Sequence, residues 1–242
     1  MAEWFADLKS DFIKTFIVED RWRYLWDGLG VTLQIALFAA LLGIVIGIVL
    51  AIIRATHDKN IETMHPGLGK FFLKLANAIA KVYLTVIRGT PVIIQLMIIY
   101  YVIFASSDNG VLIGTLAFGI NSGAYVAEIV RGGIMSIDNG QFEAGRSLGF
   151  NYVQTMWYII IPQTFKNVLP SLANEFIVLL KETSVSGYVA VKDLTKGGDI
   201  IRGITYQSFM PLIAVAIIYL IMVMFFTKLV GILERRLRKN ER

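Results

Sequence analysis

Polar side chains recur at helical spacing inside one of the apolar stretches of this 242-residue chain. Asn121, Tyr125 and Glu128 are spaced i, i+4 and i+7, which places them on one face of a helix, and Ser122 lies next to that face. A charged side chain at the centre of a lone membrane helix costs about 2.5–3.5 kcal/mol, so such a residue needs a partner or a hydrated cavity. A carboxylate with neutral hydrogen-bonding groups beside it could bind the ammonium group of a small solute.

A second polar face follows in the next apolar stretch, where Asn174 and Glu175 lie near the middle. We expect the two faces to line a common pathway, with Glu128 or Glu175 able to meet an ammonium group. Structural roles for the same residues remain open. Glu128 could pair with Arg131 or Arg88, and Asn174 could bond to a neighbouring helix.

Several kinds of chemistry are excluded by what the sequence lacks. The chain has no cysteine and only two histidines, His57 and His65, which fall in one polar segment. We therefore expect no catalytic residues and no metal site. The phosphate-binding pattern Gly-x-x-x-x-Gly-Lys-Ser/Thr does not occur, and its nearest fragment, 67–70, lacks the first glycine and the hydroxyl residue. We expect the chain to bind no cofactor of its own and not to hydrolyse ATP.

The composition indicates a membrane protein. Hydrophobic residues make up 56% of the chain and charged residues 17%, whereas soluble domains carry about 25% charged residues. The pattern predicts an all-α integral membrane fold, with an N-terminal segment 1–27, a transmembrane domain 28–235 and a basic tail 236–242. The five predicted spans are Leu29–Ile53, Val92–Ala105, Val111–Ile134, Gln163–Leu180 and Phe209–Val230.

The segments between the spans differ in character. We expect a polar loop over Arg54–Gly69 and another, external, over Asp193–Arg202. Apolar and basic residues alternate at helical spacing over Lys70–Arg88, which predicts an amphipathic helix on the membrane interface or along the bundle. That helix should end at Arg88-Gly89-Thr90-Pro91, where proline starts a new one.

The basic residues predict the orientation. With Arg54–Arg88, Arg131–Lys166 and the C-terminal end inside, 15 of the 23 lysines and arginines are cytoplasmic and 8 are not. We expect a multi-pass membrane protein, with its N-terminus outside and its C-terminus in the cytoplasm. The net charge of +5 then reflects this bias, and we expect membrane lipid and no nucleic acid as a partner.

A helix-turn-helix is predicted between the third and fourth spans. The turn signal Asp138-Asn139-Gly140 precedes Glu143, which we place in the first turn of a short helix. Ala144 and Gly145 would let another surface approach, Gly149 can end the helix in a left-handed conformation, and Asn151 can cap the second helix. The segment could dock a cytoplasmic partner or be an ordinary amphipathic loop.

The same residues resemble the cytoplasmic motif of ABC importer permeases, which reads Glu-Ala-Ala, three residues, Gly, nine residues, Ile, one residue, Leu-Pro. Glu143, Ala144, Gly149, Ile159 and Pro162 stand at the motif's spacing. The chain departs from it at two positions, with glycine at 145 for the second alanine and isoleucine at 161 for leucine.

Further stretches are similar to the polar amino-acid uptake branch of these permeases, of the histidine, glutamine and arginine type. They are 86–91 (VIRGTP) with Gln95, 124–134 (AYVAEIVRGGI), 161–163 (IPQ) and 181–184 (KETS), and the resemblance covers about 28–235.

The resemblance implies a type I ABC importer permease that carries amino acids by alternating access. It also implies a location in the bacterial cytoplasmic (inner) membrane. The loop Glu143–Gly149 would be a coupling helix, with Pro162 closing the motif. The implied partners are two copies of an ATP-binding subunit that holds ATP and Mg²⁺, a second permease, identical or homologous, and an extracytoplasmic amino-acid-binding protein.

Two other classes fit the sequence less well. A secondary transporter often shows internal repeats, and five spans do not divide evenly into two halves. A membrane-embedded enzyme would need a nucleophile with a base, or a metal cluster, and the predicted spans contain no histidine.

Overall fold

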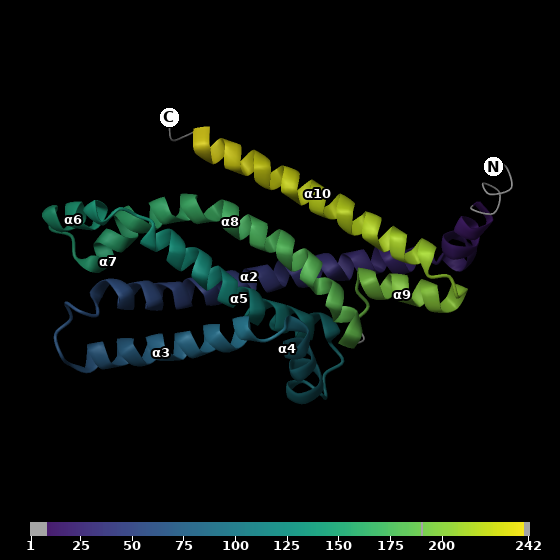
Figure 1. Cartoon of the computed structure of the whole chain (residues 1–242), viewed down its shortest axis with the longest axis horizontal. Helices are drawn as coiled ribbons and strands as arrows, with labels where there is room; N and C mark the ends of the chain where they lie inside the picture. The colour runs from purple at the N-terminus through teal and green to yellow at the C-terminus, as the bar shows by residue number, and fades with distance from the viewer. Residues whose placement is uncertain (1–8, 190, 240–242) are drawn as a thin grey trace.

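The computed structural model describes residues 9–189 and 191–239, and within these the chain forms an elongated bundle of helices with no strand. The all-α expectation is confirmed. The long helices are α2 (Trp22–Asn60), α3 (Leu68–Gly89), α5 (Gly110–Met135), α8 (Ile161–Glu182) and α10 (Phe209–Lys239). Helix α6 (Asn139–Ser147) lies at one end of the bundle and α9 (Leu194–Thr205) at the other (Figure 1). We call these the α6 end and the α9 end.

Close packing of α2 against α5 forms the centre of the bundle. A Cβ atom on Gly43 would lie 3.1 Å from the Ser122 side chain, and one on Gly47 would overlap the side chain of Val126. Glycine at both positions lets the two backbones approach closely, as small residues do between helices in lipid. The first predicted span therefore packs against α5 through its small residues.

A sharp break separates α3 from α4 (Val92–Ile98), and the pair is bent by 107°. Pro91 has no N–H to continue the helix. The side-chain amide of Gln95 donates instead to the carbonyls of Ile87 (2.8 Å) and Thr90 (3.1 Å). Buried Asn121 of α5 donates to the Gln95 side-chain oxygen at 3.1 Å. The middle of α5 thus holds the break in place.

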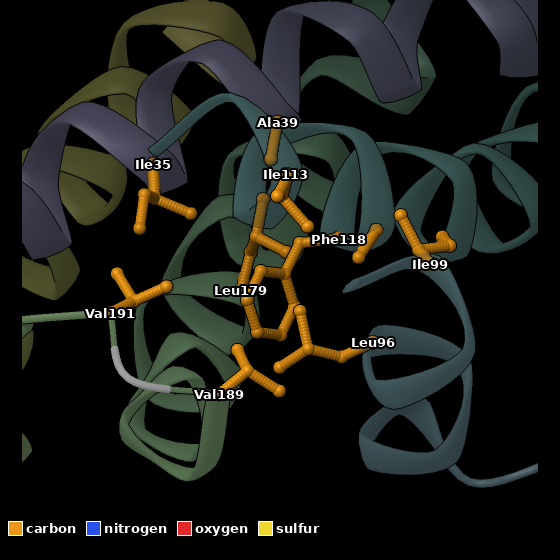
Figure 2. Close-up of a cluster of buried hydrophobic side chains, with 10 residues drawn as sticks. Ile35, Ala39, Leu96, Ile99, Ile113, Phe118, Leu179, Val189 and Val191 are labelled. Carbon is orange, nitrogen blue, oxygen red and sulfur yellow. The ribbon is translucent and has the colours of Figure 1, made fainter. Parts of the chain in front are cut away.

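The main core cluster lies beside this break and joins four helices. Figure 2 shows the ring of Phe118 from α5 at its centre, with Leu96 of α4, Leu179 of α8 and Ile35 of α2 around it. Val189, which ends the 3-10 helix η5 (Thr183–Val189), closes the cluster. Burial of each such large side chain contributes about 1.5–3 kcal/mol against water, so this cluster fixes the α9 half of the bundle.

The predicted polar loop Arg54–Gly69 is wrong over its first half. Helix α2 continues to Asn60, and only residues 61–67 connect it to α3. Two ion pairs with α5 explain why α2 continues for these additional turns. Arg54 forms an ion pair with Glu128 at 2.5 Å, and Asp58 forms one with Arg131 at 3.0 Å. Both pairs hold the end of α2 against α5.

The predicted span Val92–Ala105 is only a short helical segment, α4 followed by the π-helical turn η3 (Ile99–Ile103). The amphipathic helix before it is confirmed as α3, which packs along α2 and α5. Among the described residues, three helices are long and apolar enough to cross a membrane, α2, α5 and α10, or four if α3 with α4 and η3 is one broken span. The five-span count stays a prediction.

The loop predicted over Asp193–Arg202 is wrong, because these residues belong to α9 and its cap, whereas their external position stays a prediction. Two adjacent glycines of α9 serve helix packing. The Gly197 backbone lies against the Tyr24 carbonyl of α2, with no room for a Cβ atom, and Gly198 faces Val215 of α10. The predicted basic tail is helical through Lys239, and residues 240–242 and 1–8 lie outside the described part of the chain.

Asp193 joins α9 to the rest of the bundle from a loop outside the spans. Its fully buried carboxylate accepts from the Lys196 N–H at 2.9 Å and caps α9. The neighbouring Leu194 N–H donates to the Thr32 hydroxyl of α2 at 3.1 Å. Burial raises the pKa of Asp193 from 3.8 to about 6, although hydrogen bonds from α9 oppose the shift.

The raised pKa predicts a pH-dependent stability. The folded state binds the proton more tightly than the unfolded chain, so this stabilisation is complete below pH 3.8 and is lost as the pH rises to about 6. Asp193→Asn keeps the cap and removes the titration, and should raise the free energy of unfolding at pH 7 by about 1–3 kcal/mol.

Thermal unfolding of the detergent-solubilised protein between pH 4 and 7 measures this effect. Asp199→Asn is the matched control on the same helix, since hydrogen bonds from Arg202 and Lys196 lower the pKa of exposed Asp199 below 3.8 and outside the tested range. An unchanged pH slope in Asp193→Asn would contradict the assignment.

Candidate functional site: a projecting helical hairpin and a charged cavity

A helix-turn-helix projects at the α6 end of the bundle. Asp138 caps α6, accepting from the Gly140 N–H at 2.6 Å, and Gly149 takes the left-handed conformation expected of it, with φ 81°. Asn151 and Gln154 form a capping box on α7 (Tyr152–Thr155). These predicted caps are confirmed. Glu143, however, is the fifth residue of α6, so its predicted place in the first turn is wrong.

The two small residues of the hairpin face opposite ways. Ala144 is exposed beside Glu143, whereas Gly145 is buried against Thr155 of α7. A Cβ atom on Gly145 would lie 2.6 Å from the Thr155 hydroxyl oxygen, so α6 and α7 pack closely only with glycine there. This contact gives a physical reason for the glycine found where the permease motif has alanine.

Large apolar side chains are exposed on the hairpin and on η4 (Met156–Ile160), which follows it. Leu148 is 70% exposed, Val153 71% and Trp157 67%, and all three lie within ten residues of one another in the sequence. Clusters of exposed apolar residues on a polar element mark interaction surfaces. The hairpin therefore has the chemistry of a docking element.

The extension of α2 braces the hairpin from behind. The Lys59 ammonium group donates to the Asn139 side chain at 2.6 Å and lies 4.7 Å from the ring centre of Phe142. The Tyr152 hydroxyl lies 3.4 Å from that of Thr56. A cavity of about 290 Å³ remains between these elements. Sequence reasoning missed this brace because it placed Lys59 in a loop.

A second, polar cavity of about 570 Å³ opens between α2, α3 and α5. Glu128 is at its centre, and one carboxylate oxygen accepts from Arg54 at 2.5 Å and lies 3.9 Å from Arg88. The other oxygen lies 3.4 Å from Arg131, which also bonds Asp58. The predicted pairing of Glu128 with Arg131 and Arg88 is present, together with Arg54, which the sequence reasoning did not single out.

Tyr125 lines the same cavity. Its ring lies 5.7 Å from the Arg88 guanidinium carbon, and both side chains are partly exposed. Lys81, Leu84, Thr85 and Gly89 of α3 complete the lining. The cavity therefore carries an excess of positive charge.

Ser122 and Glu175 lie on another side of α5. The Ser122 hydroxyl donates to the Glu175 carboxylate at 3.0 Å, and both side chains line a cavity of about 640 Å³ between α2, α5, α8 and α10. The remaining lining of this cavity is almost wholly apolar. Within one chain, the two predicted polar faces thus meet at Ser122 and Glu175 but not at Tyr125 and Glu128.

The two asparagines have separate surroundings. Asn121 is buried and donates a hydrogen bond to the Gln95 side chain, so it supports the α3–α4 break. Asn174 is exposed on α8. Gln95 was notable in the sequence only through family resemblance, since a glutamine early in an apolar helix carries no specific signal. Among the described residues, no cluster of histidine and acidic side chains could hold a metal ion.

Comparison with known proteins places this architecture in a family. Residues 68–239 match the family described as the binding-protein-dependent transport system inner membrane component. A putative glutamine transport system permease protein, GlnP, of Rickettsia bellii is 40% identical over 161 residues, which cover 65% of this chain and 74% of that protein. GlnP of Escherichia coli K12 is 37% identical over 168 residues, which cover 68% of this chain and 77% of that protein.

Solved structures agree with these relatives. A crystal structure of an amino acid ABC transporter with histidines superposes with a TM-score of 0.78 at 38% identity, covering 91% of this chain and 98% of the other. An inward-facing structure of the MetNI methionine ABC transporter has a TM-score of 0.73 at 19% identity and covers 88% of this chain and 95% of the other. At that identity it supports the fold alone. The fold is that of type I ABC importer permeases.

The brace predicts that Lys59→Met loosens α6. The variant keeps the apolar stem but loses a hydrogen bond and a cation–π contact, each of which contributes about 0.5–1.5 kcal/mol. Amide hydrogen exchange over Asn139–Ser147 should accelerate about three- to tenfold. Lys74→Met, which removes an equal charge from exposed α3, is the control, and equal exchange in the two variants would contradict the brace.

The Gly145–Thr155 contact predicts a compensated double variant. Gly145→Ala should destabilise the hairpin by about 1–3 kcal/mol, because the added methyl group overlaps Thr155. Thr155→Ala removes the overlapping atoms, so the double variant should recover most of that loss. Protease cleavage within 138–160 provides the measurement, and additive effects of the two substitutions would refute the contact.

Proposed function

This chain belongs to the family of binding-protein-dependent transport system inner membrane components, and we propose that it moves amino acids through an ABC importer. Members of the family work with an ATPase and a binding protein. The substrate class rests on the curated relatives, which are named for glutamine transport, and on the amino acid ABC transporter of similar structure. The chain itself supplies the membrane passage.

The subunit composition proposed here is two permeases and two ATP-binding subunits. The second permease is either identical or homologous, and an extracytoplasmic protein delivers the amino acid. ATP and Mg²⁺ act in the ATP-binding subunits, in keeping with the absence of a phosphate-binding pattern from this sequence. This chain therefore performs no covalent chemistry.

The proposed membrane arrangement has five spans, with α3, α4 and η3 together forming one broken span. This choice places the N-terminus and α9 outside and α6 in the cytoplasm of a multi-pass inner-membrane protein. The excess of lysine and arginine at the α6 end supports it. Lys81 and Arg88 lie along α3 and not in a loop. The excess of lysine and arginine on the cytoplasmic side remains when these two are left out of the count.

The α6–α7 hairpin is the proposed contact with the ATP-binding subunit. Glu143 and Ala144 are exposed, as are the large apolar residues Leu148, Val153 and Trp157 of the same segment, and such a mixed surface suits a groove on a partner. Gly145 and Gly149 shape the hairpin itself, and Pro162 lies in the first turn of α8, which follows it. When the ATP-binding subunits close, a braced hairpin can move the ends of α2 and α5 as one body and change which side of the membrane is open.

The polar residues of α5 and α8 are proposed to border the pathway in different ways. Tyr125 and Glu128 line the charged cavity directly, and Asn121 holds the broken helix beside it. Ser122, Asn174 and Glu175 lie on other sides of the same chain, so they would reach the pathway only in the assembled complex. Polar groups placed at a broken span recur in transporters.

Reconstitution tests the proposed coupling. The purified complex should hydrolyse ATP and take up labelled glutamine into liposomes, and Glu143→Ala should reduce both uptake and retention of the ATP-binding subunit by about tenfold or more, since a charged contact at the hairpin is lost. Glu62→Ala removes an exposed carboxylate from the connection 61–67 and serves as the control.

Uptake by the chain alone, driven by an ion gradient and indifferent to Glu143, would contradict the proposal. It would instead favour a secondary transporter.

A further inference from the structure

Helix α3 has two chemically different exposed faces. One is an apolar stripe of residues between 46% and 77% exposed, made of Leu68, Phe71, Phe72, Leu75, Ile79, Val82 and Val86. The other is basic, with Lys74, Lys81 and Arg88 at intervals of seven residues, which places them in one line. Only the apolar stripe can face hydrocarbon at low cost, so the basic face must border water or a polar partner.

The basic face leads to the charged cavity between α2, α3 and α5. Three cationic side chains, Arg54, Lys81 and Arg88, line this cavity with one anionic side chain, Glu128, so its ionised groups carry a net charge of +2. Glu128 is already shared among guanidinium groups on both of its oxygens. Its carboxylate is therefore the group least available to a solute.

Arg88 is the cation with the most freedom to bind. Its side chain is 46% exposed, and its distance of 3.9 Å from Glu128 is at the limit of an ion pair. The ring of Tyr125 lies 5.7 Å from its guanidinium carbon, and the Arg88 side chain lines the cavity. The Nε atom of Arg54, by contrast, is buried without a partner and belongs to the wall.

We infer that Arg88, with Lys81 beside it, binds the α-carboxylate of the amino acid as it passes through the charged cavity. The inference rests on the proposed function and deepens it. The sequence suggested that Glu128 meets the ammonium group of the solute, whereas here the Arg88 guanidinium recognises its carboxylate. Arginine suits this task, since its planar fork matches a carboxylate with two parallel hydrogen bonds. Glu128 is a positioning residue that holds Arg54 and Arg131 away from the solute.

The test uses the purified complex with its ATP-binding subunit, without binding protein, in lipid nanodiscs. The probes are labelled L-glutamine and, as competitor, the α-amide of L-glutamine, which lacks the carboxylate. Wild type should prefer L-glutamine by about tenfold or more, and Arg88→Gln should lose that preference. Arg88→Lys, which keeps the charge but not the fork, should be intermediate. Glu128→Gln should retain the preference.

Lys74→Gln is the matched control, because it removes a charge from the same line of α3 but does not line the cavity. It should leave both binding and preference unchanged. Loss of binding in Glu128→Gln with an unaltered preference in Arg88→Gln would overturn the inference in favour of ammonium recognition.

An anionic lipid headgroup could also occupy a basic face, and the lipid composition distinguishes it from the solute. The carboxylate preference should be equal in discs with and without phosphatidylglycerol. A defect in Arg88→Gln that appears only with phosphatidylglycerol would assign Arg88 to lipid and overturn the inference. Absence of ATP-dependent uptake by the wild type would instead contradict the proposed function, so the two failures are separable.

Discussion

The close contact between α2 and α5 is the constraint on which the rest of the molecule depends. Glycines at 43 and 47 bring the two backbones together, and the ion pairs Arg54–Glu128 and Asp58–Arg131 continue the contact beyond the apolar section. In lipid there is no hydrophobic force between helices, so close packing and polar bonds must hold them. The contact carries two functions at once, because its charged end forms the wall of a cavity and its last turns brace the projecting hairpin.

Charge placement then determines which sides of the bundle meet water. The apolar stripe of α3 and the almost wholly apolar cavity between α2, α5, α8 and α10 suit lipid or another hydrophobic surface, whereas the basic line of α3 does not. The break after α3 ends the helix beside Arg88. The Gln95 side chain satisfies the carbonyls that the break exposes, and Asn121 holds that side chain through a hydrogen bond. A broken span, a cluster of compensated charges and a hairpin braced by α2 therefore form one connected unit in an importer permease.

Much of this could be predicted from the sequence. Helical periodicity and turn residues predicted α3, α5 and the caps at Gly149 and Asn151, because these features depend on local chemistry. The family motif was found by resemblance, from residue identities at fixed spacing. Prediction failed where tertiary contacts override local preference. The segment Arg54 to Asn60 was predicted to be a polar loop but is helical, because α5 supplies its ionic partners. The segment Asp193–Arg202 was also predicted to be a loop but belongs to α9 and its cap, and its two glycines serve close helix packing. Ser122 and Glu175 lie apart from Tyr125 and Glu128 because of how α5 and α8 are rotated about their own axes. The spacing of residues along the sequence does not determine that rotation.

The absence of cysteine from the natural sequence makes the central claim, that one face of α3 borders water and the other does not, directly measurable. Single substitutions Lys81→Cys and Thr85→Cys would sample the cavity side, and Val82→Cys and Val86→Cys the apolar stripe. Labelling of the complex in membranes with a charged, water-soluble thiol reagent is the measurement. The account predicts rapid labelling at 81 and 85 and protection at 82 and 86. Equal labelling of all four positions, or the reverse pattern, would contradict it.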